Sequence, residues 1–130
     1  MSLAALRGRP ALLYFNEGVG CDVCFTQMVG LEADRAAFEE AGIQLVPIVM
    51  NGLDQVRPEL RRFAITTPYA YDPGGSVSRS YDTLGKGHHA ELPGHSFVLI
   101  GADGTQRWRG DYPGMWVDPA ELAAAVKAAL

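Results

Sequence analysis

The sequence predicts an α/β fold in which helices cover both faces of a mixed central sheet, a three-layer α/β/α sandwich. Apolar, β-branched segments alternate with segments of helical periodicity along the 130 residues. An Asp-Gly turn at 103–104 joins two apolar segments as a hairpin, which adds an antiparallel pair to the sheet. We expect about five strands and about four helices, and the length favours a single domain over residues 1–130.

The elements are expected in the order β-α-β-α-β-(α)-β-β-α. Short apolar runs bounded by turn residues mark the strands, of which Ala11–Phe15 is the first. Gly42 is a typical stop signal for the first helix, and the stripe from Val56 to Ala64 gives the second helix an apolar face. The strands are expected at 11–15, 43–50, 69–71, 96–100 and 105–109, and the helices at about 22–40, 54–64, 76–81 and 118–130.

Composition excludes several classes of function. The net charge is −4 and the charges are interspersed, so nothing indicates binding to nucleic acid. No apolar run reaches the roughly 18 residues of a membrane span, and no signal-peptide pattern opens the chain. The two cysteines leave the compartment open between a cytoplasmic and an exported one, and the oligomeric state is equally open.

The segment Cys21-Asp22-Val23-Cys24 lies where the first strand gives way to the first helix. Residues three apart share one face of a helix, at about 5 Å between Cα atoms, which is within disulfide range. A bridge closing so short a loop contributes only about 2 kcal/mol, so it is a weak structural staple. The helix N-terminus favours a thiolate at Cys21, the form that attacks disulfides. The pattern therefore favours redox use over a staple, a metal site or inert thiols.

Further segments complete a resemblance to a known family. The lead-in 2–15, Asp72 with Gly75 and Tyr81, and the strand 96–100 running into the 103–104 turn accompany the Cys-x-x-Cys motif. Together they make the chain similar to the thioredoxin-like superfamily, and within it to the redoxin branch of peroxiredoxin-like (AhpC/TSA-type) and cytochrome-maturation-type proteins. The resemblance implies a thioredoxin-like fold with Cys21 as nucleophile and Cys24 as resolving cysteine. It also implies a protein or small-molecule thiol or disulfide as substrate, and no cofactor is expected.

Two departures from the family pattern surround the cysteines. Thioredoxins carry tryptophan before the first cysteine and Gly-Pro between the pair, whereas this chain has Gly20 before the pair and Asp22-Val23 within it. Asp22 is expected to raise the pKa of Cys21. The peroxidase motif needs proline seven residues and Thr or Ser three residues before its cysteine, and Tyr14 and Gly18 stand there.

The loop before the strand at 96–100 carries further candidates. Thioredoxins place a cis-proline facing the dithiol just before this strand, which makes a cis Leu92–Pro93 bond a hypothesis and His95 an alternative occupant of that place. His88, His89 and His95 have three interpretations. They are solvated loop residues, groups that tune the thiolate or move protons, or ligands that join the cysteines in a zinc or copper site.

Glu17 is the remaining candidate. Many relatives carry a buried acid six residues before the first cysteine, where this chain has Phe15. Glu17 or Asn16 can take the place of that acid. The alternative is that Glu17 is an exposed loop residue. The predicted function is that of a thiol-disulfide oxidoreductase. The alternatives are a peroxiredoxin-like antioxidant peroxidase, a Cys/His metal-binding carrier or sensor, and a binding module that has lost activity.

Overall fold

The central strand of the sheet is β1 (Ala11–Asn16) in a computed structural model that describes residues 3–130. The strand order is β3-β2-β1-β4-β5, with β1 parallel to β2, β2 parallel to β3, and β4 antiparallel to both of its neighbours. The remaining bounds are β2 (Gln44–Val49), β3 (Ala70–Tyr71), β4 (His95–Ile100) and β5 (Gln106–Asp111). The expected mixed five-stranded sheet is confirmed, and the first residue of the lead-in, Ser2, lies outside the described residues.

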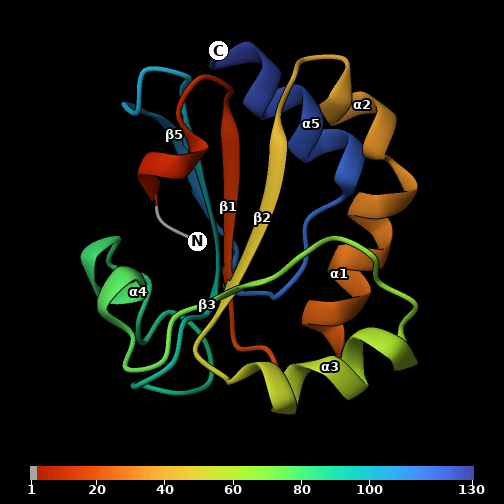
Figure 1. The fold of residues 1–130 in the computed structure, drawn as a ribbon, viewed down its shortest axis with the longest axis vertical. Coiled ribbons are helices and arrows are strands. Elements are labelled where there is room, and N and C mark those ends of the chain that lie inside the picture. Colours follow the sequence, from red (N-terminus) through yellow and green to blue (C-terminus); the bar gives the residue numbers. More distant parts are fainter. Residues whose placement is uncertain (1–2) are drawn as a thin grey trace.

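Helices cover the two faces of this sheet unequally. Figure 1 shows α1, α2 and α5 along one face, α3 below them, and the small α4 with the N-terminal turn on the other side. The bounds are η1 (Leu3–Leu6, a 3₁₀ turn), α1 (Asp22–Ala33), α2 (Arg35–Glu39), α3 (Leu53–Arg62), α4 (Ser76–Ser80) and α5 (Pro119–Ala128). The three-layer prediction is therefore confirmed, and none of the helices within residues 3–130 is long and apolar enough to cross a membrane.

The helix expected over 22–40 is in fact two helices, which is why the described part of the chain has five α-helices where about four were expected. Asp34 separates α1 from α2 with φ −100° and ψ 20°, outside the helical region. Aspartate is a weak helix former because its carboxylate competes for nearby backbone N–H groups. The apolar periodicity runs through the break and does not reveal it.

Side chains alternate between two cores along β1. Leu12 and Tyr14 belong to the larger core under α1, α2 and α5, where Phe25, Phe97 and Leu122 also lie. The residues between them along β1 point to the smaller core under η1 and α4. That second core consists of Leu6, Ala11, Leu13, Phe15, Val46, Ile48 and Val98. A strand buried on both faces explains why 11–15 is a continuous apolar run and not an alternating one.

The loop 82–94 packs closely against the start of β4. Gly94 donates its N–H to the Thr83 carbonyl at 3.2 Å. A Cβ atom at Gly94 would lie 2.4 Å from the carbonyl carbon of Lys86 and 2.7 Å from the backbone nitrogen of Gly87. Only glycine lets these two backbone segments approach so closely, and this approach sets the position of residues 86–88.

We predict that Gly94→Ala lowers the free energy of unfolding by about 1–3 kcal/mol. The added methyl group would clash with backbone atoms, which cannot move aside as a flexible side chain can. Gly114→Ala is the matched control, since nothing lies within 4 Å of a Cβ atom built there. It should change stability by no more than about 0.5 kcal/mol. Urea unfolding of both variants measures the difference, and equal midpoints would contradict the close approach.

Candidate active site

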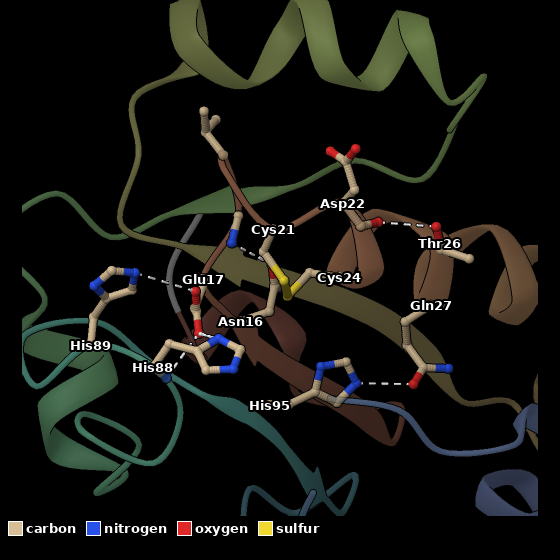
Figure 2. Close-up of a disulfide and its surroundings, with 12 residues drawn as sticks. Asn16, Glu17, Cys21, Asp22, Cys24, Thr26, Gln27, His88, His89 and His95 are labelled. Atoms are coloured by element: carbon tan, nitrogen blue, oxygen red, sulfur yellow. Dashed lines mark hydrogen bonds and ion pairs between the residues drawn. A yellow bond between two sulfur atoms is a disulfide. The ribbon is translucent and has the colours of Figure 1, made fainter. Parts of the chain in front are cut away.

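Cys21 and Cys24 form a disulfide at the start of α1, with a Cα–Cα distance of 5.3 Å. Cys21 is the N-cap residue of the helix, and its N–H donates to the Gly18 carbonyl at 2.9 Å. Cys24 lies one turn further on, on the same face (Figure 2). The predicted arrangement is confirmed: the two residues are joined at the helix terminus, where free backbone N–H groups favour a thiolate.

The two cysteines differ in their access to solvent. Cys21 keeps 7% of its surface exposed, whereas Cys24 is fully buried. Gly20, Asp22 and Val23 beside them are exposed. Met115 is buried against both cysteines and covers the pair from the loop between β5 and α5. Of the two residues, Cys21 is therefore the one that has surface in contact with solvent.

Asp22 does not stand as a free charge next to Cys21. Its carboxylate accepts a hydrogen bond from Arg62 Nη2 at 2.5 Å, and Arg62 also pairs with Glu59 at 2.9 Å. The guanidinium lies 4.4 Å from the centre of the Phe63 ring, which fixes it beside α3. The positive charge of Arg62 offsets the effect that Asp22 alone would have on the Cys21 thiolate.

Glu17 lies in the interior, with 6% of its surface exposed. Its Oε1 accepts the backbone N–H of His88 at 3.2 Å and lies 3.3 Å from Nδ1 of the same residue, while His89 Nε2 is 3.9 Å from Oε2. A Cβ atom at Gly87 would meet both Oε1 of Glu17, at 2.9 Å, and Sδ of Met115, at 3.7 Å. Gly87 thus lies between the carboxylate and the methionine that covers the disulfide.

The two exposed histidines therefore face a carboxylate and not the sulfurs, as Figure 2 also shows. Across residues 3–130, no group of three or more His, Cys, Asp and Glu side chains could hold a metal ion. The two sulfurs are bonded to each other. The hypothesis of a Cys/His metal site has no geometric support.

The hypothesis of a cis bond before Pro93 is wrong. None of the peptide bonds within residues 3–130 is cis. Pro93 forms an antiparallel bridge with Leu84, and the Leu92 carbonyl accepts the N–H of Gly85 at 3.0 Å. This small ladder holds the segment in extended, trans geometry.

His95 is the first residue of β4 and pairs with Asn16 at the end of β1. It is 1% exposed, so the interpretation of His95 as a solvated loop residue is wrong. Its Nδ1 lies 3.1 Å from the Tyr14 hydroxyl and its Nε2 lies 2.9 Å from Oε1 of Gln27. Burial lowers the pKa of His95 from 6.5 to about 4, so the ring is neutral at pH 7.

The family model of the AhpC/TSA family matches residues 1–109. The chain belongs to the AhpC/TSA family. Together with the joined cysteine pair, this membership makes it an enzyme of thiol-dependent redox chemistry, acting on thiol substrates. No curated protein matches the chain.

Solved structures similar to this AhpC/TSA-family protein have the same fold. Reduced 2-Cys peroxiredoxin of Plasmodium vivax matches with a TM-score of 0.82 and 19% identity over 98% of this chain and 82% of that one. Enterococcus faecalis AhpC matches with a TM-score of 0.84 and 15% identity over 96% and 77%. A secreted Mycobacterium tuberculosis disulfide oxidoreductase homologous to E. coli DsbE matches with a TM-score of 0.72 and 22% identity over 96% and 85%. At these identities the likeness shows the fold, which is thioredoxin-like as predicted.

Three residues of this family member escaped the sequence interpretation: Tyr14, Gln27 and Met115. The sequence analysis gave Tyr14 a place in an apolar strand and in the altered peroxidase motif but no partner, because its hydrogen bond to His95 spans 81 residues. Gln27 follows Cys24 by three positions and so shares its helix face, which is the one signal that could have indicated it. Met115 lies in an irregular loop with φ 63°, a region that few non-glycine residues adopt, and no pattern predicts it.

The buried histidine of this protein should make its stability depend on pH. The unfolded chain protonates His95 near pH 6.5 and the folded chain only near pH 4. Between these values the unfolded state binds more protons, so the free energy of unfolding falls as the pH is lowered. We predict that His95 accounts for a loss of about 2–3 kcal/mol between about pH 7 and about pH 4.5.

Denaturant unfolding of the oxidised protein at several pH values measures this loss. The stability of His95→Gln should be less sensitive to acid by that amount. If the acid sensitivities of wild type and His95→Gln coincide, His95 does not enter the folded state neutral.

Removal of the guanidinium beside Asp22 should slow the reaction of Cys21. We predict that Arg62→Gln in the reduced protein lowers the rate of iodoacetamide alkylation of Cys21 at neutral pH by about twofold, because the carboxylate of Asp22 is no longer paired. Arg61→Gln, one position earlier on α3, is the matched control and should alkylate at the wild-type rate. The effect should shrink in high salt, and an unchanged rate in Arg62→Gln at low salt would contradict the role assigned to the pair.

Proposed function

We propose that this protein catalyses dithiol–disulfide exchange, with Cys21 as nucleophile, Cys24 as resolving cysteine and residues 1–130 acting as one domain. The observation that carries the proposal is the unequal exposure of the joined pair at the helix N-terminus. The cysteine that keeps some exposed surface is the residue at the N-cap, where a thiolate is favoured. The buried sulfur is out of reach of a substrate and within reach of Cys21.

The exchange has two steps. The Cys21 thiolate attacks one sulfur of a substrate disulfide, the substrate S–S bond breaks, and the departing sulfur leaves with the electron pair and takes a proton. The sulfur of Cys24 then loses its proton and attacks Cys21, which breaks the mixed disulfide and releases the second substrate thiol. Substrate is reduced by two electrons, and Cys21 and Cys24 are oxidised to the disulfide.

Surrounding residues support these steps in the proposal. Gly20, at φ 95°, gives the loop just before Cys21 a backbone conformation that favours glycine. Val19 and Val23 expose apolar surface on either side of it, which favours a peptide disulfide over a small polar one. Glu17 supplies a buried carboxylate near the pair, and the Asp22–Arg62 pair sets the charge at the helix start. Pro93 acts only through the ladder that positions the start of β4.

Peroxide reduction is the second candidate function, and membership of the AhpC/TSA family favours it. In that reaction the Cys21 thiolate attacks the O–O bond, an alcohol or water leaves, and the resulting sulfenic acid condenses with Cys24 to give the disulfide and water. The residues that the peroxidase motif requires are replaced by Tyr14 and Gly18. This replacement is the reason for placing disulfide exchange first.

Cysteine variants test the assigned roles. We predict that Cys21→Ser abolishes the reduction of insulin disulfides, because it removes the attacking thiolate. Cys24→Ser should still attack once and then accumulate a mixed disulfide with the substrate, because the second step has no sulfur to carry it. Mass spectrometry without reductant detects this adduct, and full turnover by Cys24→Ser would exclude Cys24 as the resolving residue.

The two candidate functions differ in the substrate consumed. With dithiothreitol as electron donor, the wild-type protein should reduce insulin at a rate well above that of Cys21→Ser. Peroxide consumption under the same conditions should be slow. A fast peroxidase that leaves insulin untouched would reverse the order of the two candidates.

A further inference from the structure

Met115 has a backbone conformation that its residue type rarely adopts. Its φ is 63°, in the left-handed region where residues other than glycine are uncommon. Its N–H donates to the carbonyl of Tyr112 at 2.8 Å, which closes a turn in the loop between β5 and α5. Such a conformation costs free energy and persists only where the surrounding structure holds it, so its side chain merits a functional explanation.

The side chain of Met115 is buried apart from the two main cores. It is 4% exposed, and among the buried apolar residues within 3–130 it forms a separate cluster with Cys21 and Cys24. Under this cover Cys24 has no exposed surface, whereas Cys21 keeps 7%. The strained residue is therefore the one whose apolar side chain packs on the disulfide.

The loop that carries this methionine is fastened on both sides of it. On one side, Tyr112 donates its backbone N–H to the carbonyl of His95 at 2.8 Å. On the other side, the backbone N–H of Val117 donates to Oε1 of Gln27, and Nε2 of Gln27 donates to the carbonyl of Val117, each at 2.9 Å. Gln27 is buried and lies one helical turn after Cys24 on α1. The helix that carries the cysteines thus also holds the loop that covers them.

A second loop limits the methionine from another direction. A Cβ atom at Gly87 would lie 3.7 Å from Sδ of Met115 and 2.8 Å from the Cα atom of Gly94. The backbone of the loop 82–94 therefore lies against the thioether, and it is held there by its own close approach to Gly94. With both loops in place, the side chain has little freedom to leave the cysteines.

A thioether suits this position chemically. It has no proton to give up and no charge, so it does not compete with the cysteines in exchange. Its chain is unbranched and adaptable, so it can follow the two sulfurs as their bond opens and closes. A lysine, a histidine or a third cysteine there would bring a reactive group to the pair.

The need for a cover rests on the proposed function. In the resolving step the Cys24 thiol loses its proton, its sulfur bonds to Cys21, and the substrate sulfur leaves with the electron pair. This step succeeds only if Cys24 has not already attacked another disulfide. If both cysteines were open to substrate, two substrate molecules could attach to one protein and neither would be released by the partner cysteine.

We propose that Met115 determines which cysteine meets the substrate, because it covers Cys24 and leaves Cys21 accessible. A substrate disulfide is then attacked by Cys21 alone, and Cys24 reacts only with the mixed disulfide at Cys21. Met115 exchanges neither protons nor electrons in this scheme. It is a specificity-determining residue and not a catalytic one.

A Cys21→Ser background isolates Cys24 for the test. The protein is mixed with dithiobis(nitrobenzoate), and attack by the Cys24 thiolate breaks the reagent's S–S bond, forms a mixed disulfide and releases one coloured thionitrobenzoate. The reaction should be slow with Met115 in place. Adding Met115→Gly should accelerate it by about 10- to 100-fold, because no local opening is then needed to reach the sulfur. Glycine adopts φ 63° without strain, so the change removes the cover alone.

Three further variants sharpen this measurement in the same background. Met115→Ala also removes the cover but keeps the Cβ atom, so it should be fast even if glycine loosens the loop. Met115→Leu keeps a similar apolar volume and should stay slow. Leu13→Ala makes a cavity in the smaller core, on the other face of β1, and should lower stability without exposing Cys24. Its rate should stay at the Cys21→Ser value.

The protein with both cysteines gives a second readout. Reduced protein is alkylated with a limiting amount of iodoacetamide, and the label is located by peptide mass mapping. The first label should lie almost entirely on Cys21 in the wild type and should be shared with Cys24 in Met115→Gly. A purely structural role of Met115 would change stability and leave this distribution as it is.

Several results would overturn the proposal. They are a fast reaction of Cys24 with Met115 in place, an unchanged rate in both Met115→Gly and Met115→Ala, and an equal acceleration in Leu13→Ala or Met115→Leu. Failure of the proposed function has a different signature, since the wild-type protein would then leave insulin unreduced. The reactivity of Cys24 in Cys21→Ser needs no turnover and is measured independently of that result.

Discussion

The pairing of β1 with β4 holds the whole site together. In its register Asn16 lies opposite His95, which brings the end of the central strand and the start of β4 to one edge of the sheet. The loop that leaves β1 there leads directly to Cys21, and α1 returns over the face that carries Tyr14. A slip of one residue in this register would turn Tyr14 and His95 to opposite faces and separate the histidine from the cysteines.

The two cysteines of the disulfide lie in different surroundings. Cys21 lies at a helix terminus and a solvent edge, where backbone N–H groups and the offset charges of Asp22 and Arg62 govern its thiolate. Cys24 lies in the interior, where desolvation opposes any charge. The pair is therefore chemically unequal, although its four-residue segment looks symmetric in sequence. This inequality is the physical basis of the order of attack that we propose.

Much of this arrangement could be predicted from the sequence because it is local. The runs of apolar residues, the Asp-Gly hairpin and the placement of the cysteines at a strand–helix junction each depend on neighbours in the chain, and the structure confirms them. The partners could not be predicted, because Arg62 reaches Asp22 across 40 residues and His95 reaches Gln27 across 68. The break at Asp34 and the trans geometry before Pro93 were missed for a related reason, since neither local periodicity nor a family resemblance reports backbone angles.

The central claim is that the bond between Cys21 and Cys24 opens and closes reversibly in the folded protein. The most direct measurement is an equilibrium titration in glutathione buffers of graded redox poise, with the free thiols counted by alkylation and the fold followed by circular dichroism. We expect one two-electron transition in which both thiols appear together while the fold persists. Thiols that appear only when the protein unfolds would contradict the claim, because the bridge would then be a structural staple.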